Sequence, residues 1–229
     1  RDTDRSRGLG DVYKRQAQMR LFHLSDLHIG KRVNEFSMIE DQKYILERIL
    51  DLAEKEMPDG VILAGDIYDK QIPSAEAVQV FDEFITKLAE RKLPVFVISG
   101  NHDSAERLAF GGRLLNSRGI YLSPVYDGTV MKIPIADQYG TVWIHLLPFI
   151  RPAAVRRVFE DESDLITDVQ SAVRAVISHM EIDPNERNIL VAHQFVTGAS
   201  RCESEDIQVG GLDNIDASVF EAFDYTALG

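Results

Sequence analysis

The chain has 229 residues, 45% of them hydrophobic and 27% charged, and a formal net charge of −12. This is enough for one substantial core, and no apolar run approaches the length that spans a bilayer, so we expect one globular domain and no membrane segment. The single cysteine, Cys202, excludes an internal disulfide and fits the cytoplasm. The acidic charge argues against nucleic-acid binding, unless many carboxylates hold metal ions that reverse the local field.

Residues 1–18 differ from the rest of the chain. They lack apolar periodicity and carry five basic and three acidic side chains. Residues 11–16 also match the translation of a transposon-end adaptor used in sequencing libraries. We therefore expect residues 1–18 to be a non-native tail, with a disordered native extension as the alternative, and residues 19–229 to form the domain.

From residue 20 the chain alternates short apolar runs with longer amphipathic ones, which predicts a layered α/β fold with helices flanking the sheets. Short runs rich in Val, Ile, Leu and aromatic residues are typical of buried strands. Turn residues and alternation predict a hairpin at residues 123–135, so we expect the sheets to be mixed. The predicted strands cover residues 20–24, 61–64, 95–99, 143–147, 188–192 and 225–228.

Three helices are predicted between these strands. Ser37 and Glu40 have the spacing of a capping box ahead of a helix that runs through residue 52. Ser74 is expected to cap a second helix, in which apolar residues recur at helical spacing through residue 88. A third helix is expected to follow Ser163 or Asp164.

Polar residues follow four of the predicted strands, at the edge where open α/β sheets place their ligands. Taken singly, each motif has an ordinary explanation as a turn or a cap. Together, oxygen donors and neutral imidazoles suit Mn²⁺, Fe²⁺ or Zn²⁺, and the lack of cysteine in the set argues against a structural zinc site. The residues are Asp26 and His28, then Asp66 and Asp69, then Asn101, His102 and Asp103, and finally His193.

A shared carboxylate is needed to bring two such ions to about 3.5–4 Å, where they grip both ends of a displacement at phosphorus. Asp66 is the candidate for this bridge. A different feature follows the strand at residues 143–147, where Phe149 and Arg151 offer an aromatic ring and a cation. We consider contact with a DNA backbone and an ordinary solvated helix start as equal interpretations of Arg151.

In order and context, these motifs resemble those of the calcineurin-like metallophosphoesterases. The resemblance narrows to the bacterial SbcD-type nuclease subunits of the double-strand-break repair nuclease family, and it extends over nearly all of residues 19–229. The segments that carry it are residues 63–69, 72–78, 99–108, 147–152 and 210–213.

The resemblance implies two metal ions, usually manganese, that share one carboxylate. Asp26, His28 and Asp66 are implied to hold one ion. Asp66, Asn101 and His193 are implied to hold the other.

The resemblance also implies a catalytic histidine, His102, placed to stabilise or protonate the leaving 3′ oxygen. Asp103 is a candidate to orient His102, with hydrogen bonding within the loop as the equal alternative. The role of Asp69, which stands where the family has a polar residue beside the site, stays open.

One departure from the family pattern concerns the last residues. The family continues after the strand at residues 225–228 with a His-x-His motif that completes both metals, whereas this sequence stops at Gly229. The capping domain and the segment that binds the partner ATPase are expected farther on. We therefore expect a gene fragment in which each ion lacks one protein ligand, so that manganese binding and DNA cleavage are impaired.

The expected activity is metal-dependent exonuclease and endonuclease cleavage of DNA ends and hairpins. The resemblance implies that the protein acts as a homodimer with an SbcC-type SMC-like ATPase. One alternative is a metallophosphatase on the same scaffold, although such relatives show Asp-Arg-Gly where this chain has Asp69, Lys70 and Gln71. The other alternative is an inactive binding or assembly module.

Overall fold

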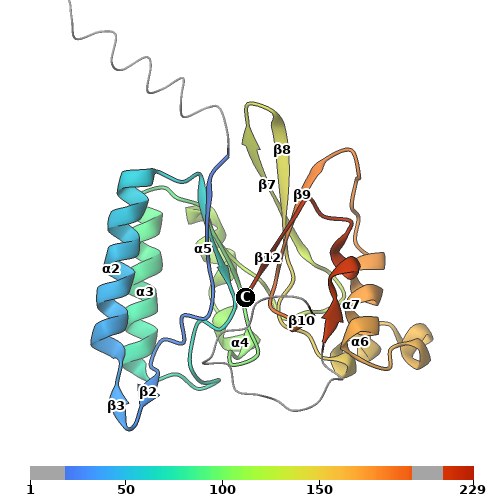
Figure 1. Cartoon of the computed structure of the whole chain (residues 1–229), viewed down its shortest axis with the longest axis horizontal. Helices are drawn as coiled ribbons and strands as arrows, with labels where there is room; N and C mark the ends of the chain where they lie inside the picture. Colours follow the sequence, from blue (N-terminus) through green and yellow to red (C-terminus); the bar gives the residue numbers. More distant parts are fainter. Residues whose placement is uncertain (1–18, 198–213) are drawn as a thin grey trace, which may run out of the picture.

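The computed structural model describes residues 19–197 and 214–229 (Figure 1). Two four-stranded sheets face each other in the centre, and helices cover the outer face of each sheet (Figure 1). The layered α/β fold expected from the sequence is therefore confirmed. The tail at residues 1–18 and the motif at residues 210–213 lie outside the described residues.

The first sheet contains only parallel strands, in the order β1-β4-β5-β6. Strands β4 and β5 are buried along their whole length, which explains their unbroken Val and Ile content. All four strands end at the edge of the sheet that carries the polar motifs. Their bounds are Leu21–Leu24 for β1, Gly60–Ala64 for β4, Val95–Ile98 for β5 and Ile120–Leu122 for β6.

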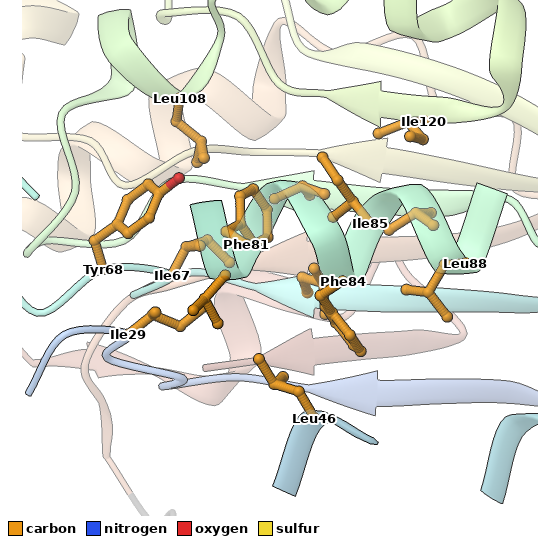
Figure 2. Close-up of a cluster of buried hydrophobic side chains, with 14 of the residues drawn as sticks. Ile29, Leu46, Ile67, Tyr68, Phe81, Phe84, Ile85, Leu88, Leu108 and Ile120 are labelled. Atoms are coloured by element: carbon orange, nitrogen blue, oxygen red, sulfur yellow. The ribbon is translucent and has the colours of Figure 1, made fainter. Parts of the chain in front are cut away.

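Two long helices, α2 (Ile39–Glu56) and α3 (Ala75–Glu90), cover the outer face of this sheet (Figure 1). Phe81, Phe84 and Leu88 of α3 pack onto the strands in a dense apolar layer (Figure 2). Shorter elements connect these parts. They are the hairpin of β2 (Arg32–Val33) and β3 (Phe36–Ser37), α4 (Ala105–Leu108), α5 (Gly112–Leu115) and the 3₁₀ turn η1 (Asn116–Arg118).

The second sheet is mixed, in the order β12-β9-β8-β7, and only the β7–β8 pair is antiparallel. Helices α6 and α7 cover its outer face (Figure 1). The strands are β7 (Met131–Asp137), β8 (Gly140–Leu146), β9 (Arg187–Ala192) and β12 (Tyr225–Leu228). The other elements are α6 (Pro152–Val158), η2 (Glu160–Leu165), α7 (Val169–Ser178), β10 (Val196–Thr197), β11 (Ile215–Asp216) and η3 (Ala217–Phe220). No described helix is both long and apolar enough to cross a membrane.

Several predicted boundaries were wrong. Ser37 does not form a capping box, because it is extended and paired with Arg32 in the β2–β3 hairpin, and α2 begins after Met38 without a side-chain cap. The third helix begins later than expected, because Asp168 is its cap and accepts a hydrogen bond from the Ser171 amide at 2.7 Å. The hairpin is β7–β8 instead of residues 123–135.

The two sheets pack through a shared apolar layer. Phe96 of β5 is fully buried there, and its ring stacks on that of Tyr121 at a centroid distance of 5.5 Å. Ile144 and Val191 contribute from the second sheet. This layer fixes the distance between the two sheet edges that carry the polar residues.

We expect Phe96→Ala to lower the free energy of unfolding by about 3–5 kcal/mol, because it leaves a cavity between the sheets. Phe36, which is 76% exposed, supplies the matched control, and Phe36→Ala should change the free energy of unfolding by no more than about 0.5 kcal/mol. Urea unfolding followed by circular dichroism measures both. Equal effects of the two substitutions would contradict the assigned packing.

Candidate metal centre

The loops after β1 and β4 run side by side and hold each other through their backbones. The amide of Asp26 donates to the Gly65 carbonyl at 3.2 Å, and the amide of His28 donates to the Asp66 carbonyl at 2.9 Å. Asp26, His28 and Asp66 all have positive φ, at 55°, 43° and 49°. A left-handed backbone conformation at residues other than glycine costs free energy, and such residues cluster at functional sites. Three of them in two adjacent loops therefore mark this edge of the sheet as a candidate functional site.

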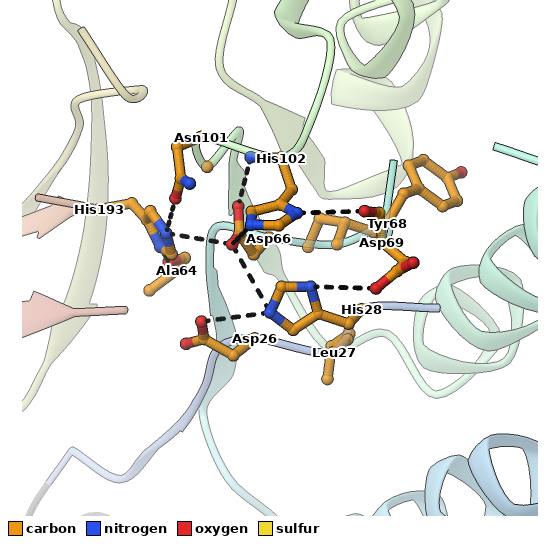
Figure 3. A network of polar contacts seen from close by, with 12 residues as sticks. Asp26, Leu27, His28, Ala64, Asp66, Tyr68, Asp69, Asn101, His102 and His193 are labelled. Atoms are coloured by element: carbon orange, nitrogen blue, oxygen red, sulfur yellow. Dashed lines mark hydrogen bonds and ion pairs between the residues drawn. The ribbon is translucent and has the colours of Figure 1, made fainter. Parts of the chain in front are cut away.

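Asp66 is the centre of the polar cluster (Figure 3). Its side chain is 4% exposed, and its Oδ2 atom lies 3.6 Å from Nε2 of His28, 3.5 Å from Nε2 of His193 and 4.0 Å from Nε2 of His102. Asp26 Oδ1 lies 3.7 Å from the same His28 nitrogen. Three other chain segments, the loops after β1, β5 and β9, therefore direct polar atoms at one buried carboxylate.

The rings of His193 and His102 are oriented by backbone carbonyls. Nδ1 of His193 donates to the Ala64 carbonyl at 2.8 Å, and Nδ1 of His102 donates to the Asp69 carbonyl at 3.1 Å. Each bond turns the other ring nitrogen, Nε2, toward Asp66. A hydrogen bond from one ring nitrogen to a carbonyl commonly fixes the tautomer and orientation of a metal-binding or catalytic histidine.

Asn101 completes the half of the cluster next to the second sheet. Its Oδ1 lies 3.0 Å from Nε2 of His193. His193 follows β9, whereas Asn101 follows β5, so this contact joins the two sheets at their edges. The structure thus brings together all five predicted ligands, and His102 lies beside them.

The charges in the cluster shift its pKa values. Burial alone raises the pKa of the Asp66 carboxyl, but the contact with His193 and the amide of His102 outweigh it and hold the pKa below its usual value. Burial lowers the pKa of His193, but Asp66 reverses this and raises it. The contact with Asp26 raises the pKa of His28. The ionised carboxylates and the protonated rings of His28 and His193 thus stabilise each other.

Gly100 allows the closest approach in the site. A Cβ atom at this position would lie 2.1 Å from Oδ1 of Asp66 and 2.3 Å from its backbone nitrogen. Only glycine therefore lets the loop after β5 approach Asp66. The sequence pattern placed Gly100 in the motif but gave no sign of this contact, because the partner lies more than thirty residues away.

The described contacts of Asp103 do not include the ring of His102, which it was a candidate to orient. The hydrogen bonds described for its carboxylate come from the backbone amides of Ile67 at 3.0 Å, Tyr68 at 2.9 Å and Gly100 at 2.9 Å. Burial raises the pKa of this carboxyl, and the three amides offset the effect only in part. The bond from Gly100 is the hydrogen bonding within the loop that was the alternative expectation. The bonds from Ile67 and Tyr68 join the loops after β4 and β5, and the ring of His102 is held by the Asp69 carbonyl.

Among residues 19–197 and 214–229, two sets of three side chains have the spacing that a metal ion needs, with ligand atoms within 4.8 Å of one another. One set is His28, Asp66 and His102, and the other is Asp26, Asp66 and His193. Asp66 belongs to both. The resemblance implied a different division, with Asp26 and His28 on the same ion. Asp26 Oδ1 also lies 3.7 Å from Nε2 of His28, so the geometry fits that pairing as well.

Phe149 and Arg151 lie next to this cluster. The Phe149 ring centroid is 6.5 Å from that of His193, and the Arg151 guanidinium carbon is 5.7 Å from the Phe149 centroid. Of these two predicted DNA contacts, Phe149 therefore lies beside the candidate ligand His193, and Arg151 lies beside Phe149.

Comparison with known proteins finds curated relatives in two staphylococci. The SbcD subunit of the nuclease SbcCD from Staphylococcus epidermidis is 35% identical over 215 residues, which cover 92% of this chain and 56% of that protein. The protein of the same name from Staphylococcus saprophyticus is 34% identical with the same coverage. The chain thus spans about half the length of the curated relatives it matches.

Among solved structures, TT1561 of Thermus thermophilus aligns with a TM-score of 0.45 and 12% identity, over 83% of this chain and 73% of that one. That likeness is too weak to support any conclusion. The family model for calcineurin-like phosphoesterases, in contrast, matches residues 19–218. The chain therefore belongs to the calcineurin-like phosphoesterase family.

Proposed function

We propose that this chain is the phosphoesterase domain of a two-metal DNA nuclease. The observation that carries the proposal is Asp66, a buried carboxylate with three imidazole nitrogens within 4.0 Å of one oxygen. Two curated relatives of the chain are named nuclease subunits, which favours a phosphodiester as the substrate. Residues 19–229 form the proposed domain.

The residues around Asp66 fit two divalent ions, with Mn²⁺ as the proposed ion. Carboxylate, amide and imidazole donors suit Mn²⁺ chemically, and positive charge between Asp66 and its neighbours would replace the protons that the imidazoles otherwise hold. Asp26 and His28 are the proposed ligands on one side of Asp66, and Asn101 and His193 are those on the other. When bound, such ions polarise the phosphoryl group and offset the charge that develops on it.

His102 is proposed as the catalytic proton donor. Its side chain is 45% exposed, unlike the buried Asp66, so it is open to a substrate. Because the Asp69 carbonyl holds Nδ1, Nε2 is the nitrogen that faces the reacting group and passes a proton to the leaving 3′ oxygen. Phe149 and Arg151 are proposed to contact the DNA beside it.

The partner, oligomeric state and location of the protein are also part of the proposal. Both relatives are named as one subunit of the nuclease SbcCD, which supports assembly of this chain with an SbcC-type ATPase. We also propose a homodimer in the cytoplasm that processes DNA ends and hairpins.

Substitutions of Asp66 and His102 distinguish metal binding from proton donation. Asp66→Asn should weaken Mn²⁺ binding by more than about 100-fold, since it removes the shared carboxylate. His102→Ala should leave Mn²⁺ binding within about threefold but lower DNA hydrolysis by at least about 100-fold. Calorimetry measures the metal, and cleavage of linear DNA is compared with that of p-nitrophenyl phosphate. Hydrolysis of the phosphate ester alone would contradict the proposed nuclease, and loss of metal in His102→Ala would make His102 a ligand.

Asp103→Asn tests whether Asp103 acts through the loops. The amide retains one acceptor oxygen for three backbone donors, so the free energy of unfolding should fall by about 2–3 kcal/mol, with weaker Mn²⁺ binding. Thermal unfolding and calorimetry measure the two effects. Unchanged stability and metal binding together with lost turnover would instead support a direct role in the reaction.

The pH dependence of metal binding follows from the raised pKa values of His28 and His193. Both rings begin to take up protons above their ordinary value of 6.5, and a protonated ring cannot bind metal. Mn²⁺ affinity should therefore fall as the pH is lowered from about 8 to about 6, and binding should release protons. Calorimetry in two buffers that differ in ionisation enthalpy measures both. Affinity that stays constant over this range would refute the two histidines as ligands.

A further inference from the structure

The loop between β8 and α6 is held rigidly against the metal centre. The amide of Leu147 donates to the Val191 carbonyl at 3.0 Å, and the amide of Phe149 donates to the Ser99 carbonyl at 2.9 Å. The buried Gln194 donates through Nε2 to the Ile150 carbonyl at 3.4 Å. Backbone contacts with both sheets thus fix the loop, independently of what its side chains touch.

Side chains in this loop differ in burial. Leu147 and Ile150 are 0% and 2% exposed, respectively, and anchor the loop in the core under α6. Phe149 between them is only partly buried, and Arg151 is exposed. A partly exposed aromatic ring on a fixed backbone is placed to contact a ligand without losing side-chain freedom on binding.

Arg151 is a cation with no carboxylate partner among the described residues. Some arginines of the domain are paired, as in the contacts of Arg91 with Glu54 and Arg187 with Asp137. The Arg151 guanidinium instead lies 5.7 Å from the Phe149 ring centroid. Its N–H groups therefore stay available to an anion beside Phe149, whose ring centroid lies 6.5 Å from that of His193.

We propose that Phe149 and Arg151 form a second substrate subsite, which binds the nucleotide adjacent to the scissile phosphodiester. Arg151 contacts the phosphate of that nucleotide, and Phe149 supports its base. Base stacking on an aromatic ring tolerates any base, and the phosphate contact carries no sequence information, so the subsite recognises a polynucleotide without reading its sequence. The inference rests on the proposed nuclease function and identifies the residues that distinguish a polymer from a small phosphodiester.

The test compares binding and hydrolysis in Arg151→Gln and Phe149→Leu. Arg157→Gln is the matched control, because Arg157 is an exposed arginine of α6 and its loss changes the net charge equally. Binding of a fluorescent single-stranded oligonucleotide is followed by anisotropy in Ca²⁺. Hydrolysis in Mn²⁺ is measured on the oligonucleotide and on bis(p-nitrophenyl) phosphate, which has no adjacent nucleotide.

We expect Arg151→Gln and Phe149→Leu each to weaken oligonucleotide binding by about tenfold. Arg151→Gln should also reduce the slope of log affinity against log salt by about 0.7, as expected for one lost phosphate contact on a single strand. Both variants should lose at least about tenfold more activity on the oligonucleotide than on bis(p-nitrophenyl) phosphate, because only the oligonucleotide reaches the subsite. Arg157→Gln should match the parent in every measurement.

Three results would overturn the subsite: no binding of the oligonucleotide by the parent chain, affinities of both variants equal to the parent's, or equal losses on the two hydrolysed substrates. Failure of the nuclease proposal looks different. A parent chain that binds both Mn²⁺ and the oligonucleotide, the latter through Arg151 and Phe149, but hydrolyses neither substrate supports the subsite and contradicts the nuclease activity.

Discussion

Three backbone amides converge on one buried carboxylate, and the geometry of the metal centre depends on that contact. The Asp103 carboxylate accepts from Ile67 and Tyr68 in one loop and from Gly100 in another, each at about 3 Å. Buried amides without partners are costly, so these bonds hold the two loops together more strongly than side-chain packing at an exposed edge does. Asp66 and Asn101, which the two loops carry, are positioned as a result.

The rest of the fold brings the other residues of the metal centre to Asp66. The parallel strands of the first sheet bring three loops to one edge, and the layer between the sheets brings His193 to the same place. The positive φ angles of Asp26, His28 and Asp66 are unfavourable locally, and they persist because neighbouring backbones form hydrogen bonds across them. The site is therefore a product of tertiary structure, although each of its residues lies in a short motif.

Much of this arrangement could be predicted from the sequence, for identifiable reasons. The central strands β4 and β5 are continuous apolar runs, and their predicted ends differ from the observed ones by a single residue. The residues of the site were predicted because they directly follow strands. Helix starts were harder. Ser163 and Asp164 are good caps locally, but the third helix begins at a capping box of Asp168 with Ser171, in which serine replaces the usual Glu or Gln. The three-residue strand β6 was missed because so short a run has no periodicity.

The contacts that orient the site could not be predicted in the same way. The carbonyls of Ala64 and Asp69 hold two imidazole rings, and every residue has a carbonyl, so no side-chain pattern indicates which one is used. The same limit applies to Gly100, whose role depends on the position of Asp66 in space. It applies to Asp103 as well, since its partners are backbone amides.

The position of His193 on the second sheet has a consequence for the whole domain. Its contacts with Asp66 and Asn101 cross from one sheet to the other, so an ion held between them fastens the two halves of the sandwich together. A ligand that binds only the folded state adds stability in proportion to the logarithm of its concentration above the dissociation constant. The melting temperature of this domain then becomes a gauge of the free metal around it, and metal-depleted cells would hold a looser protein that proteases remove more readily.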